Sequence, residues 1–539
     1  MMSNLERLVR FGIPFMLVLI FSMTAAAQTD RLRLGMTTGD EGTVGPYTYN
    51  SGDPGWNMLL LQYDTLYQLD ADGVAQPWLA RNLALSDDGL SFTMDLRDDV
   101  TWHDGEAFTA EDVAFSIDYF QQFLHPRWTR VVRPIESVEV LGDFQVRMQL
   151  SALTPSLELG IFSDVPMVPE HIWSVIGDPA EHTFTIEDNV GNGPYRLVEY
   201  APDQFYRFQA YANYWAGTPQ IDELVFIRYA DMTGALAAIQ ANEVDMLVSS
   251  IPPEQADFLG MNPDLAVAQG PLFSTQMINF DVTRPPFDMP EVRQAISLAI
   301  DREDIVETVY LGQATLGNPG WVHPDSPRFN PDIATTYDPE AAAALLDEVG
   351  IVDSDGDGIR EFAGAPFMPE LLTPSDNALR IRIGDLVGEM LNAVGIGVQV
   401  EVVEGSILGD AVWPGFDVRQ GRDYELATFG WSPPLQADPT RVASLVHSNP
   451  DIASFNLTGY SSPEMDALLD ALNATNDSQR QQELLNEIQT LIAEDLPFIM
   501  ILYPNGVYAY RPAVYDDWLF MTGQGIFHKL SFLPAAARP

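Results

Sequence analysis

The residues best spaced for chemistry are the alternating carboxylates of the segment 351–362, which reads IVDSDGDGIREF. A calcium loop of the EF-hand kind takes side-chain oxygens from positions 1, 3 and 5, has glycine at position 6 and uses a backbone carbonyl at position 7. Counting from the first aspartate gives a candidate ligand set of Asp353, Asp355, Asp357, Ile359 through its carbonyl, and Glu361. The glutamate expected at position 12 is replaced by Gly364. The pattern therefore predicts either a calcium loop or an Asx-rich turn without a metal.

Large aromatic rings in loops rich in glycine and proline form a second group of candidate site residues. Tyr47 and Tyr49 lie in PYTYN, Trp321 lies in PGWVHP, and Trp431 lies in ATFGWSPPLQADP. Ligands of α/β folds bind in crevices at strand ends, and apolar and aromatic side chains line most such pockets. The rings therefore indicate either the wall of a ligand pocket or the rim of a packed core.

No motif in the sequence supplies an evident catalytic nucleophile or base. None of the seven histidines forms an HExxH metalloprotease motif, and no GxSxG elbow occurs. His103, in TWHDGEAF, stands alone beside an Asp-Gly turn, an arrangement typical of a structural hydrogen bond. The only lysine, Lys529, follows His528, so a phosphate-binding GxxxxGK(S/T) loop is missing and ATP hydrolysis by this chain is disfavoured.

Length, charge and cysteine content narrow the class of protein. The chain has 539 residues, 46% of them hydrophobic, which predicts a globular protein of two or three domains. A formal net charge of −50, from 77 acidic and 27 basic residues, argues against a nucleic-acid partner. The absence of cysteine excludes thiol catalysis, disulfides and Cys-ligated zinc sites.

The N-terminus reads as a secretory signal peptide. Arg7 and Arg10 form a basic start, residues 11–23 form an apolar run, and Ala25–Ala27 supply a small-residue cleavage site. The apolar run is shorter than the roughly 20 residues that a membrane-spanning helix needs. Since no cysteine is present for a lipid anchor, we expect a soluble periplasmic protein that begins near Gln28.

Helix-like and strand-like segments alternate along the mature chain, which predicts an α/β architecture. Thr109 and Asp112 form a capping box, and Ser462 precedes a proline suited to the first helical position. Ser478 and Gln481 predict another helix start of the capping-box type. The stretches IDELVFIRYA and DYELATFGW are typical of strands.

Several stretches resemble one family, in order and at the family's spacing. Residues 63–117, which run from YDTLYQL to EDVAFSI, resemble the signature region of the bacterial extracellular solute-binding proteins of family 5. These are the dipeptide-, oligopeptide- and nickel-binding components of ABC importers. The likeness continues through VGNGPYRLVEY, ANYWAGTPQIDELVF, INFDVTRPPFDMPEVRQAI and NLTGYSSPEMDALL to PFIMILY, and so covers nearly the whole mature chain.

The resemblance implies the large, three-domain form of the type II periplasmic binding protein fold, an α/β fold with two lobes that close about a hinge. The implied organisation is a signal peptide at 1–27, domain I at 28–57, 190–270 and 508–539, an inserted domain II at 58–189, domain III at 281–500, and hinge segments at 271–280 and 501–507.

The resemblance also implies the nature of the ligand. Peptide-binding members usually place an acidic residue shortly after the GW of a domain III strand, where it pairs with the α-amino group of the peptide. In this sequence GW is followed by SPPLQ, and the first carboxylate downstream is Asp438. We therefore expect a peptide ligand if the loop of Asp438 turns inward. The expected ligand contacts are Trp431, Asp438, Tyr47, Asn279 and Trp321.

The expected partners follow from the same likeness: a small-molecule ligand and the permease subunits of an ABC importer in the inner membrane. We expect a monomer that needs no cofactor, with structural calcium as the one candidate ion. Two alternatives remain open. One is a binding protein for an oligosaccharide or a metal chelate, since aromatic loops also suit sugars, and the other, from a different class, is a secreted hydrolase.

Overall fold

The structure is a computed structural model that describes most of the chain. The described residues are 30–37, 42–48, 55–125, 127–154, 157–432, 437–475 and 477–539, without the side chain of Arg130. The expected signal segment 1–27 and Tyr49 lie outside them. None of the helices within these ranges combines the length and the apolar character that a membrane crossing requires.

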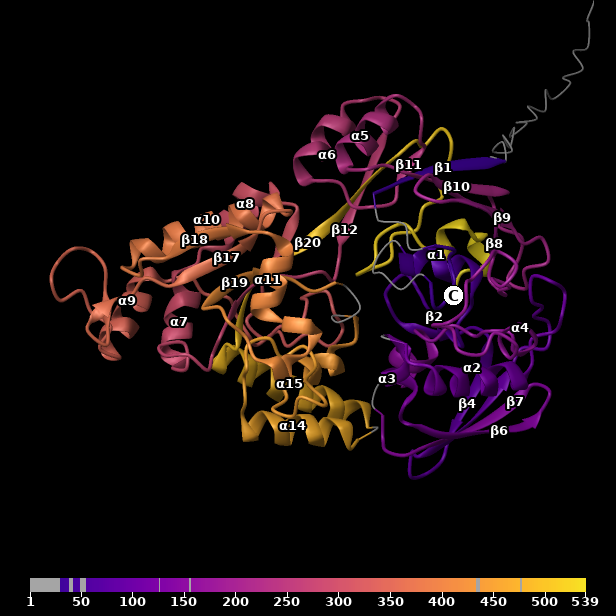
Figure 1. The fold of residues 1–539 in the computed structure, drawn as a ribbon, viewed down its shortest axis with the longest axis horizontal. Coiled ribbons are helices and arrows are strands. Elements are labelled where there is room, and N and C mark those ends of the chain that lie inside the picture. Colours follow the sequence, from indigo (N-terminus) through magenta and orange to yellow (C-terminus); the bar gives the residue numbers. More distant parts are fainter. Residues whose placement is uncertain are drawn as a thin grey trace, which may run out of the picture.

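Two lobes joined by crossing strands make up the described chain (Figure 1). Lobe 1 holds the described residues before 272 and after 504, and lobe 2 holds residues 276–504. The upper sheet of lobe 1 contains β1 (Arg31–Met36), β8 (Tyr195–Ala201), β9 (Phe205–Ala210), β10 (Glu223–Arg228), β11 (Met246–Leu247) and β12 (Ala266–Pro271). The helices that pack on this sheet are α1 (Gly55–Gln62), α5 (Met232–Gln240) and α6 (Pro253–Gly260).

A smaller antiparallel sheet in the order β4-β5-β7-β6 forms the lower part of lobe 1. Its strands are β4 (Ala80–Leu85), β5 (Ser91–Leu96), β6 (Ile135–Gly142) and β7 (Gln145–Leu150). A hairpin of β2 (Tyr67–Leu69) and β3 (Ala75–Pro77) precedes it. The remaining elements of this part are α2 (Ala110–Gln122), α3 (Trp128–Val132), the π-helix η1 (Leu157–Phe162) and α4 (Glu170–Trp173).

Lobe 2 is a mixed α/β body whose central strands lie in the order β18-β17-β19-β13-β20. Its strands are β13 (Gln276–Phe280), β14 (Ala314–Leu316), β15 (Glu361–Phe362), β16 (Ala365–Pro366), β17 (Glu370–Pro374), β18 (Gln399–Val403) and β19 (Leu426–Phe429). Its α-helices are α7 (Pro290–Ala299), α8 (Arg302–Tyr310), α9 (Pro339–Glu348), α10 (Ala378–Ala393), α11 (Gly405–Val412), α13 (Ala443–Val446), α14 (Pro463–Asn473) and α15 (Ser478–Asp495). Short 3-10 turns are η2 (Pro414–Phe416), η3 (Val418–Gln420) and η4 (Pro439–Val442).

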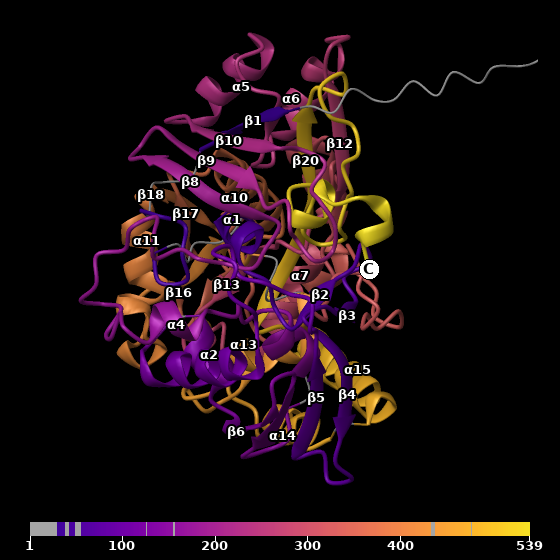
Figure 2. The same cartoon turned by 90° about the vertical axis from the view of Figure 1, so that its right-hand side faces the viewer.

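The strand β20 (Phe498–Tyr510) runs through both lobes. Its first half pairs with β13 and β14 in lobe 2, and residues 505–510 pair with β12 in lobe 1. Figure 2 shows β12 and β20 side by side. Because residues 276–280 form β13 within the lobe 2 sheet, the first crossing segment is residues 272–275, shorter than the expected 271–280. On the second side the chain crosses as one continuous strand, whose backbone pairs with β14 up to Pro504 and with β12 from Asn505 on.

The hydrophobic cores follow the lobes. One continuous core joins the upper and lower parts of lobe 1, from Leu32 in β1 through Trp102 to Phe532 near the C-terminus. Lobe 2 is filled by separate cores on the two faces of its sheet. Since each buried cluster of the described residues lies within one lobe, the lobes can move as two bodies about the crossing strands.

Local capping signals place most of the predicted helix starts. The box of Thr109 and Asp112 is present at α2, and the Ser462 hydroxyl accepts from the Met465 N–H at 3.3 Å at the start of α14. The predicted N-cap at Ser478 is wrong by one residue. The N-cap of α15 is Asp477, whose carboxylate accepts from Arg480 N–H at 2.7 Å. A carboxylate beside the positive helix N-terminus is favoured there.

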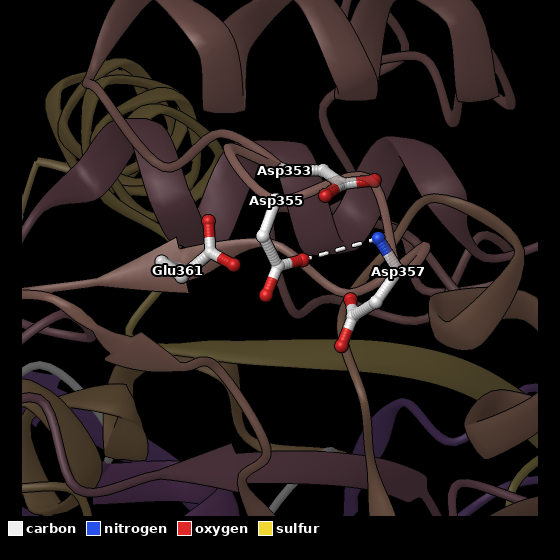
Figure 3. A group of neighbouring side chains, drawn as sticks. All are labelled: Asp353, Asp355, Asp357 and Glu361. Carbon is white, nitrogen blue, oxygen red and sulfur yellow. Dashed lines mark hydrogen bonds between the residues drawn. The ribbon is translucent and has the colours of Figure 1, made fainter.

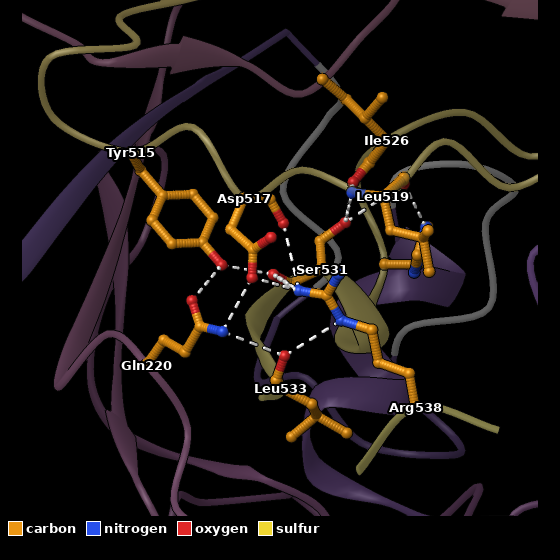
Figure 4. A network of polar contacts seen from close by, with 9 residues as sticks. Gln220, Tyr515, Asp517, Leu519, Ile526, Ser531, Leu533 and Arg538 are labelled. Carbon is orange, nitrogen blue, oxygen red and sulfur yellow. Dashed lines mark hydrogen bonds and ion pairs between the residues drawn. The ribbon is translucent and has the colours of Figure 1, made fainter. Parts of the chain in front are cut away.

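The C-terminal tail is held to lobe 1 by a polar network (Figure 4). It includes η5 (Lys529–Phe532) and η6 (Ala535–Ala537). The Arg538 guanidinium donates to the Asp517 carboxylate at 2.6 Å, and Gln220 donates to the same carboxylate at 2.8 Å. Gln220 in turn accepts from the Tyr515 hydroxyl at 3.0 Å. The tail is thus tied to the loop between β9 and β10.

Candidate functional site

A cavity of about 410 Å³ lies between the two lobes. Its lobe 1 wall is mainly apolar, with Leu69, Val74, Leu83, Leu85, Leu157 and Leu159 from β2, the β2–β3 turn, β4 and η1. Its lobe 2 wall is more polar, with Arg328, Asp438, Thr440, Ser478 and Gln481. Phe273, from the first crossing segment, closes the back. A bound molecule would therefore touch both lobes and the segment about which they turn.

A smaller cavity of about 90 Å³ adjoins the first. The two share Leu69, Leu159, Ala437, Asp438 and Gln524 as lining residues, so they form one branched cleft. The smaller branch carries charge on its lobe 1 side. There the Arg127 Nε lies 3.1 Å from both oxygens of Asp164, and its guanidinium lies 3.9 Å from the centroid of the Trp56 ring. Arg441 lines the facing side.

Asp438 stands where the two branches meet. The residue is 5% exposed and is the N-cap of η4. Its Oδ1 accepts from the Thr440 N–H at 3.1 Å and from the Thr440 hydroxyl at 2.7 Å. Its Oδ2 accepts no hydrogen bond from the described part of the chain. Because a buried carboxylate is costly unless it is paired, a cationic group entering the cleft would find a favourable partner here.

The chemistry of the cleft is that of recognition. Among its described lining residues none is a histidine, and the Thr440 hydroxyl, which donates to the Asp438 carboxylate, does so within the cap of η4. His103, the most motif-like histidine of the sequence, lies elsewhere and is structural: its Nε2 donates to the Gly193 carbonyl at 3.0 Å and its Nδ1 accepts from Gly191 N–H at 3.3 Å. The arrangement offers apolar surface, one buried carboxylate and paired charges to a guest molecule.

The family profile described as "Bacterial extracellular solute-binding proteins, family 5 Middle" matches residues 74–452. The chain belongs to this family. The match spans most of the lower part of lobe 1, the strands β8 to β12, the first crossing segment and most of lobe 2, and so includes part of each wall of the cleft, with Leu157 on one side and Asp438 on the other. The expected family and the expected two-lobed fold are thereby confirmed.

Relatives and solved structures of the family agree with the fold. The chain is 26% identical over 472 residues to the oligopeptide-binding protein AppA of Bacillus subtilis, covering 85% of this chain and 83% of that protein. It is 28% identical over 469 residues to heme-binding protein A of Haemophilus influenzae, covering 81% of each. The structure of a periplasmic oligopeptide-binding protein from Thermotoga maritima superposes with a TM-score of 0.82 at 23% identity, over 95% of this chain and 99% of that one.

Trp431, one of the predicted ligand contacts, lies beside the first crossing segment and outside both cavities. Its backbone pairs with the crossing segment, because Trp431 N–H donates to the Thr275 hydroxyl at 2.8 Å and its carbonyl accepts from Thr275 N–H at 3.0 Å. Its half-buried ring packs 5.0 Å from Phe455 and 5.1 Å from Phe429, centroid to centroid. Contact between this ring and a ligand stays a prediction.

Three other predicted contacts are packing residues. Trp321 is fully buried and lies 5.6 Å from Phe498 in the core of lobe 2. Asn279 is 2% exposed in the middle of β13. Tyr47 stacks on Phe120 and donates its hydroxyl to the Phe123 carbonyl at 2.9 Å. None of the three is among the described lining residues of the cleft, and contact between them and a ligand stays a prediction.

Residues of the cleft that sequence reasoning missed carry no motif. Leu83 and Leu85 look like ordinary strand residues, and Arg127 and Asp164 are 37 positions apart in sequence. The π-helix η1 is the one local signal, since such irregular turns often occur at functional sites. Its first residues, Leu157 and Glu158, line the larger cavity.

The aspartate-rich loop gathers its carboxylates as the calcium pattern requires (Figure 3). One oxygen from each of Asp353, Asp355, Asp357 and Glu361 lies within 4.8 Å of the others. The same carboxylates also accept backbone N–H groups, as in an Asx-rich turn: Gly356 and Gly358 donate to Asp353 at 2.7 and 3.0 Å, and Ile359 N–H donates to Asp357 at 2.8 Å. Both interpretations of the sequence therefore remain, and the loop lies far along the chain from the cleft residues.

Chelation separates the two interpretations. If calcium binds this loop, adding a chelator should lower the melting temperature of the wild type, because a ligand at 100 times its Kd stabilises the native state by roughly 2.7 kcal/mol. Asp355→Asn is the matched control, since an amide oxygen can still accept from Asp357 N–H but removes one negative charge. The chelator should shift its melting temperature far less. Identical shifts, or none in the wild type, would leave the turn without a metal.

Proposed function

We propose that this family member captures a peptide with a free amino terminus in the cleft between its lobes and delivers it to an ABC importer of the inner membrane. The observation that carries the proposal is the position of Asp438, a 5% exposed carboxylate with one oxygen free of described partners, at the junction of a cleft lined by both lobes. The names of the relatives support a peptide, and the segment 1–27 supports export to the periplasm.

Capture works by differential stabilisation of the closed state. A ligand that touches Leu157 on lobe 1 and Asp438 on lobe 2 favours the arrangement in which both touch it at once. Closure removes water from the Asp438 carboxylate, so its bond to an ammonium group strengthens, as charge-assisted bonds do in a low dielectric. The permease would then distinguish the closed, loaded protein from the open one.

Binding without reaction fits the cleft better than hydrolysis does. A hydrolase would need an acid, base or nucleophile set around the scissile bond. The described cleft residues offer Asp72, Glu158, Asp164 and Asp438 as carboxylates; Asp164 pairs with Arg127, and one oxygen of Asp438 caps η4. We therefore propose that the protein is not an enzyme and acts as a monomeric carrier.

Native mass spectrometry of the purified mature protein tests the ligand class directly. A retained mass that matches a peptide supports the proposal. A retained mass that matches an oligosaccharide, heme or another metal chelate would overturn the peptide and favour the corresponding alternative. The relative that is named as a heme-binding protein makes the metal chelate a concrete alternative.

Asp438→Asn should weaken binding of a free-amine peptide about tenfold, which corresponds to roughly 1.4 kcal/mol. Asparagine is as good an N-cap as aspartate, so the bonds from Thr440 persist and the change removes charge more than structure. Titration calorimetry with the free-amine peptide and with its N-acetylated form measures the effect. The acetylated peptide should bind wild type and variant equally.

Equal loss for both peptides would mean that Asp438 acts through the structure of η4. No loss for either would place the amine elsewhere in the cleft. The melting temperature of Asp438→Asn, which should stay close to that of the wild type, checks that the fold is intact.

A further inference from the structure

The smaller branch of the cleft carries an arginine on each of its two walls. Arg127 stands on the lobe 1 side and Arg441 on the lobe 2 side. The carboxylates among its described lining residues are those of Asp164 and Asp438. Two positive and two negative charges of the described residues therefore line a cavity of about 90 Å³, so the charges of the branch balance before a ligand enters.

An ammonium group bound to Asp438 changes this balance. The amino terminus of a peptide adds one positive charge, so three positive charges then face two negative ones in the described branch. A charge that loses its water in the closed cleft is costly unless an opposite charge accompanies it. A carboxylate that belongs to the ligand and lies close to its amino terminus restores the balance.

Arg127 keeps one edge of its guanidinium for such a carboxylate. Its Nε donates to both oxygens of Asp164 at 3.1 Å, and its Nη2 donates to Oδ1 at 2.5 Å. In the described part of the chain, Nη1 makes no hydrogen bond. Because a guanidinium presents five N–H groups in a planar fork, the edge formed by Nη1 and the second N–H of Nη2 can bind a carboxylate. The stacking of the guanidinium on Trp56, 3.9 Å from the ring centroid, holds the plane of the fork.

Arg441 lies one turn away from the acceptor for the amine. It belongs to η4, and its N–H donates to the Asp438 carbonyl at 3.0 Å. Side chains three residues apart in a 3-10 turn lie on the same side of it, and both of these side chains line the smaller branch. A ligand whose ammonium group reaches Asp438 therefore has the Arg441 guanidinium close to the atoms that follow the amine.

We propose that the smaller branch is a carboxylate subsite, in which Arg127 and Arg441 bind a carboxylate of the ligand's first residue from opposite lobes while Asp438 binds the amine of that residue. The inference rests on the proposed peptide function and narrows its substrate class. Two kinds of ligand present this pair of groups. One is a peptide that begins with aspartate or glutamate, and the other is a peptide whose first glutamate is linked through its side chain and keeps its α-carboxylate free.

Four tripeptides with free amino termini test the subsite by titration calorimetry on the wild type. They are Glu-Leu-Ala, its isomer linked through the γ-carboxyl group, Gln-Leu-Ala, and Leu-Glu-Ala, which carries the same charge one residue later. One or both of the first two should bind about tenfold more tightly than the last two. The tighter isomer identifies which carboxylate the arginines bind. Equal affinities of all four, or a preference for Leu-Glu-Ala, would overturn the subsite.

Arginine variants locate the bound carboxylate. Arg441→Gln should reduce the preference for the tighter acidic peptide over Gln-Leu-Ala to about twofold or less, because the ratio of the two affinities isolates the contact with the carboxylate. Arg127→Gln is combined with Asp164→Asn, so that no carboxylate is left without its partner, and should reduce the preference in the same way. Arg328→Gln removes a charge from the larger branch and should change both affinities by the same factor.

The outcomes separate the subsite from the function on which it rests. If native mass spectrometry finds no peptide and the wild type binds none of the four tripeptides, the peptide function fails and the subsite fails with it. If the tripeptides bind without a preference for an acidic first residue, peptide capture stands and the subsite is overturned. A preference that survives in Arg441→Gln and is lost in Arg328→Gln would place the carboxylate in the larger branch and would also overturn the subsite.

Discussion

The stability advantage of the wild type over His125→Gln is expected to shrink by roughly 1.4 kcal/mol for each pH unit as the pH falls from 6.5 toward 4. Burial lowers the pKa of His125 from 6.5 to about 4, so the folded protein holds this ring neutral while the unfolded chain takes up a proton. The stabilisation is fully present above the unfolded pKa and is lost as the pH falls to the folded one.

The contacts of His125 require the neutral ring. Its Nδ1 accepts from the N–H groups of Arg127 and Trp128 at 3.1 and 3.2 Å, and its Nε2 donates to the Pro46 carbonyl at 2.9 Å. A proton on Nδ1 would break both accepted bonds. Glutamine can accept and donate but does not titrate, which makes it the matched replacement.

Urea unfolding of both proteins at several pH values measures the effect, and the difference between them cancels the titration of the many carboxylates. A constant difference would show that His125 takes up its proton equally in the folded and the unfolded state, and would contradict the expectation. Burial also lowers the pKa of His323 and of His528 to about 4, so the same comparison applies to them.

Features whose interacting residues lie close together in the sequence could be predicted, and features that depend on distant segments could not. The capping box at Thr109 and the Asp353 loop were predictable because their partners lie within a few residues. The family resemblance supplied the two-lobed fold and pointed to Asp438, which lies in the cleft. The place of Trp321 could not be predicted, because a ring in a PGW loop can turn inward or outward; in the structure it packs 5.6 Å from Phe498.

Contacts between distant segments could not be predicted from one sequence. The place of β4 at the edge of its sheet follows from the order of four strands, which a strand pattern does not specify. From the sequence, the only lysine, Lys529, showed just that the phosphate-binding GxxxxGK(S/T) loop is missing. Its partner, Asp64, is 465 positions away in the chain.

Lys529→Met is expected to lower the free energy of unfolding by about 3–5 kcal/mol, because removal of one member of a buried ion pair leaves the other charge uncompensated. Lys529 is 1% exposed and Asp64 is fully buried. The ammonium group donates to Asp64 Oδ1, and it lies 5.3 Å from the centroid of the Trp78 ring. Methionine has a similar volume, so the loss reports charge more than a cavity.

Asp64 is the point at which three segments of lobe 1 meet. Its Oδ2 accepts from the Tyr214 hydroxyl at 3.0 Å and from Trp215 Nε1 at 3.1 Å, and its backbone N–H donates to Asn192 at 2.8 Å. The pair with Lys529 adds the C-terminal tail. Burial lowers the pKa of Lys529, and the attraction of Asp64 opposes that shift.

Two comparisons isolate the charge effect in urea unfolding. Arg147→Met removes one member of an exposed pair, in which Arg147 lies 2.8 Å from Glu139, and should cost less than about 1 kcal/mol. The double variant Lys529→Met with Asp64→Asn removes both charges and keeps an acceptor for Tyr214 and Trp215, so it should recover much of the loss.

If Lys529→Met costs no more than Arg147→Met, the buried pair does not hold the tail to lobe 1. If the double variant is no more stable than Lys529→Met, the loss comes from the missing side chain and not from an uncompensated carboxylate.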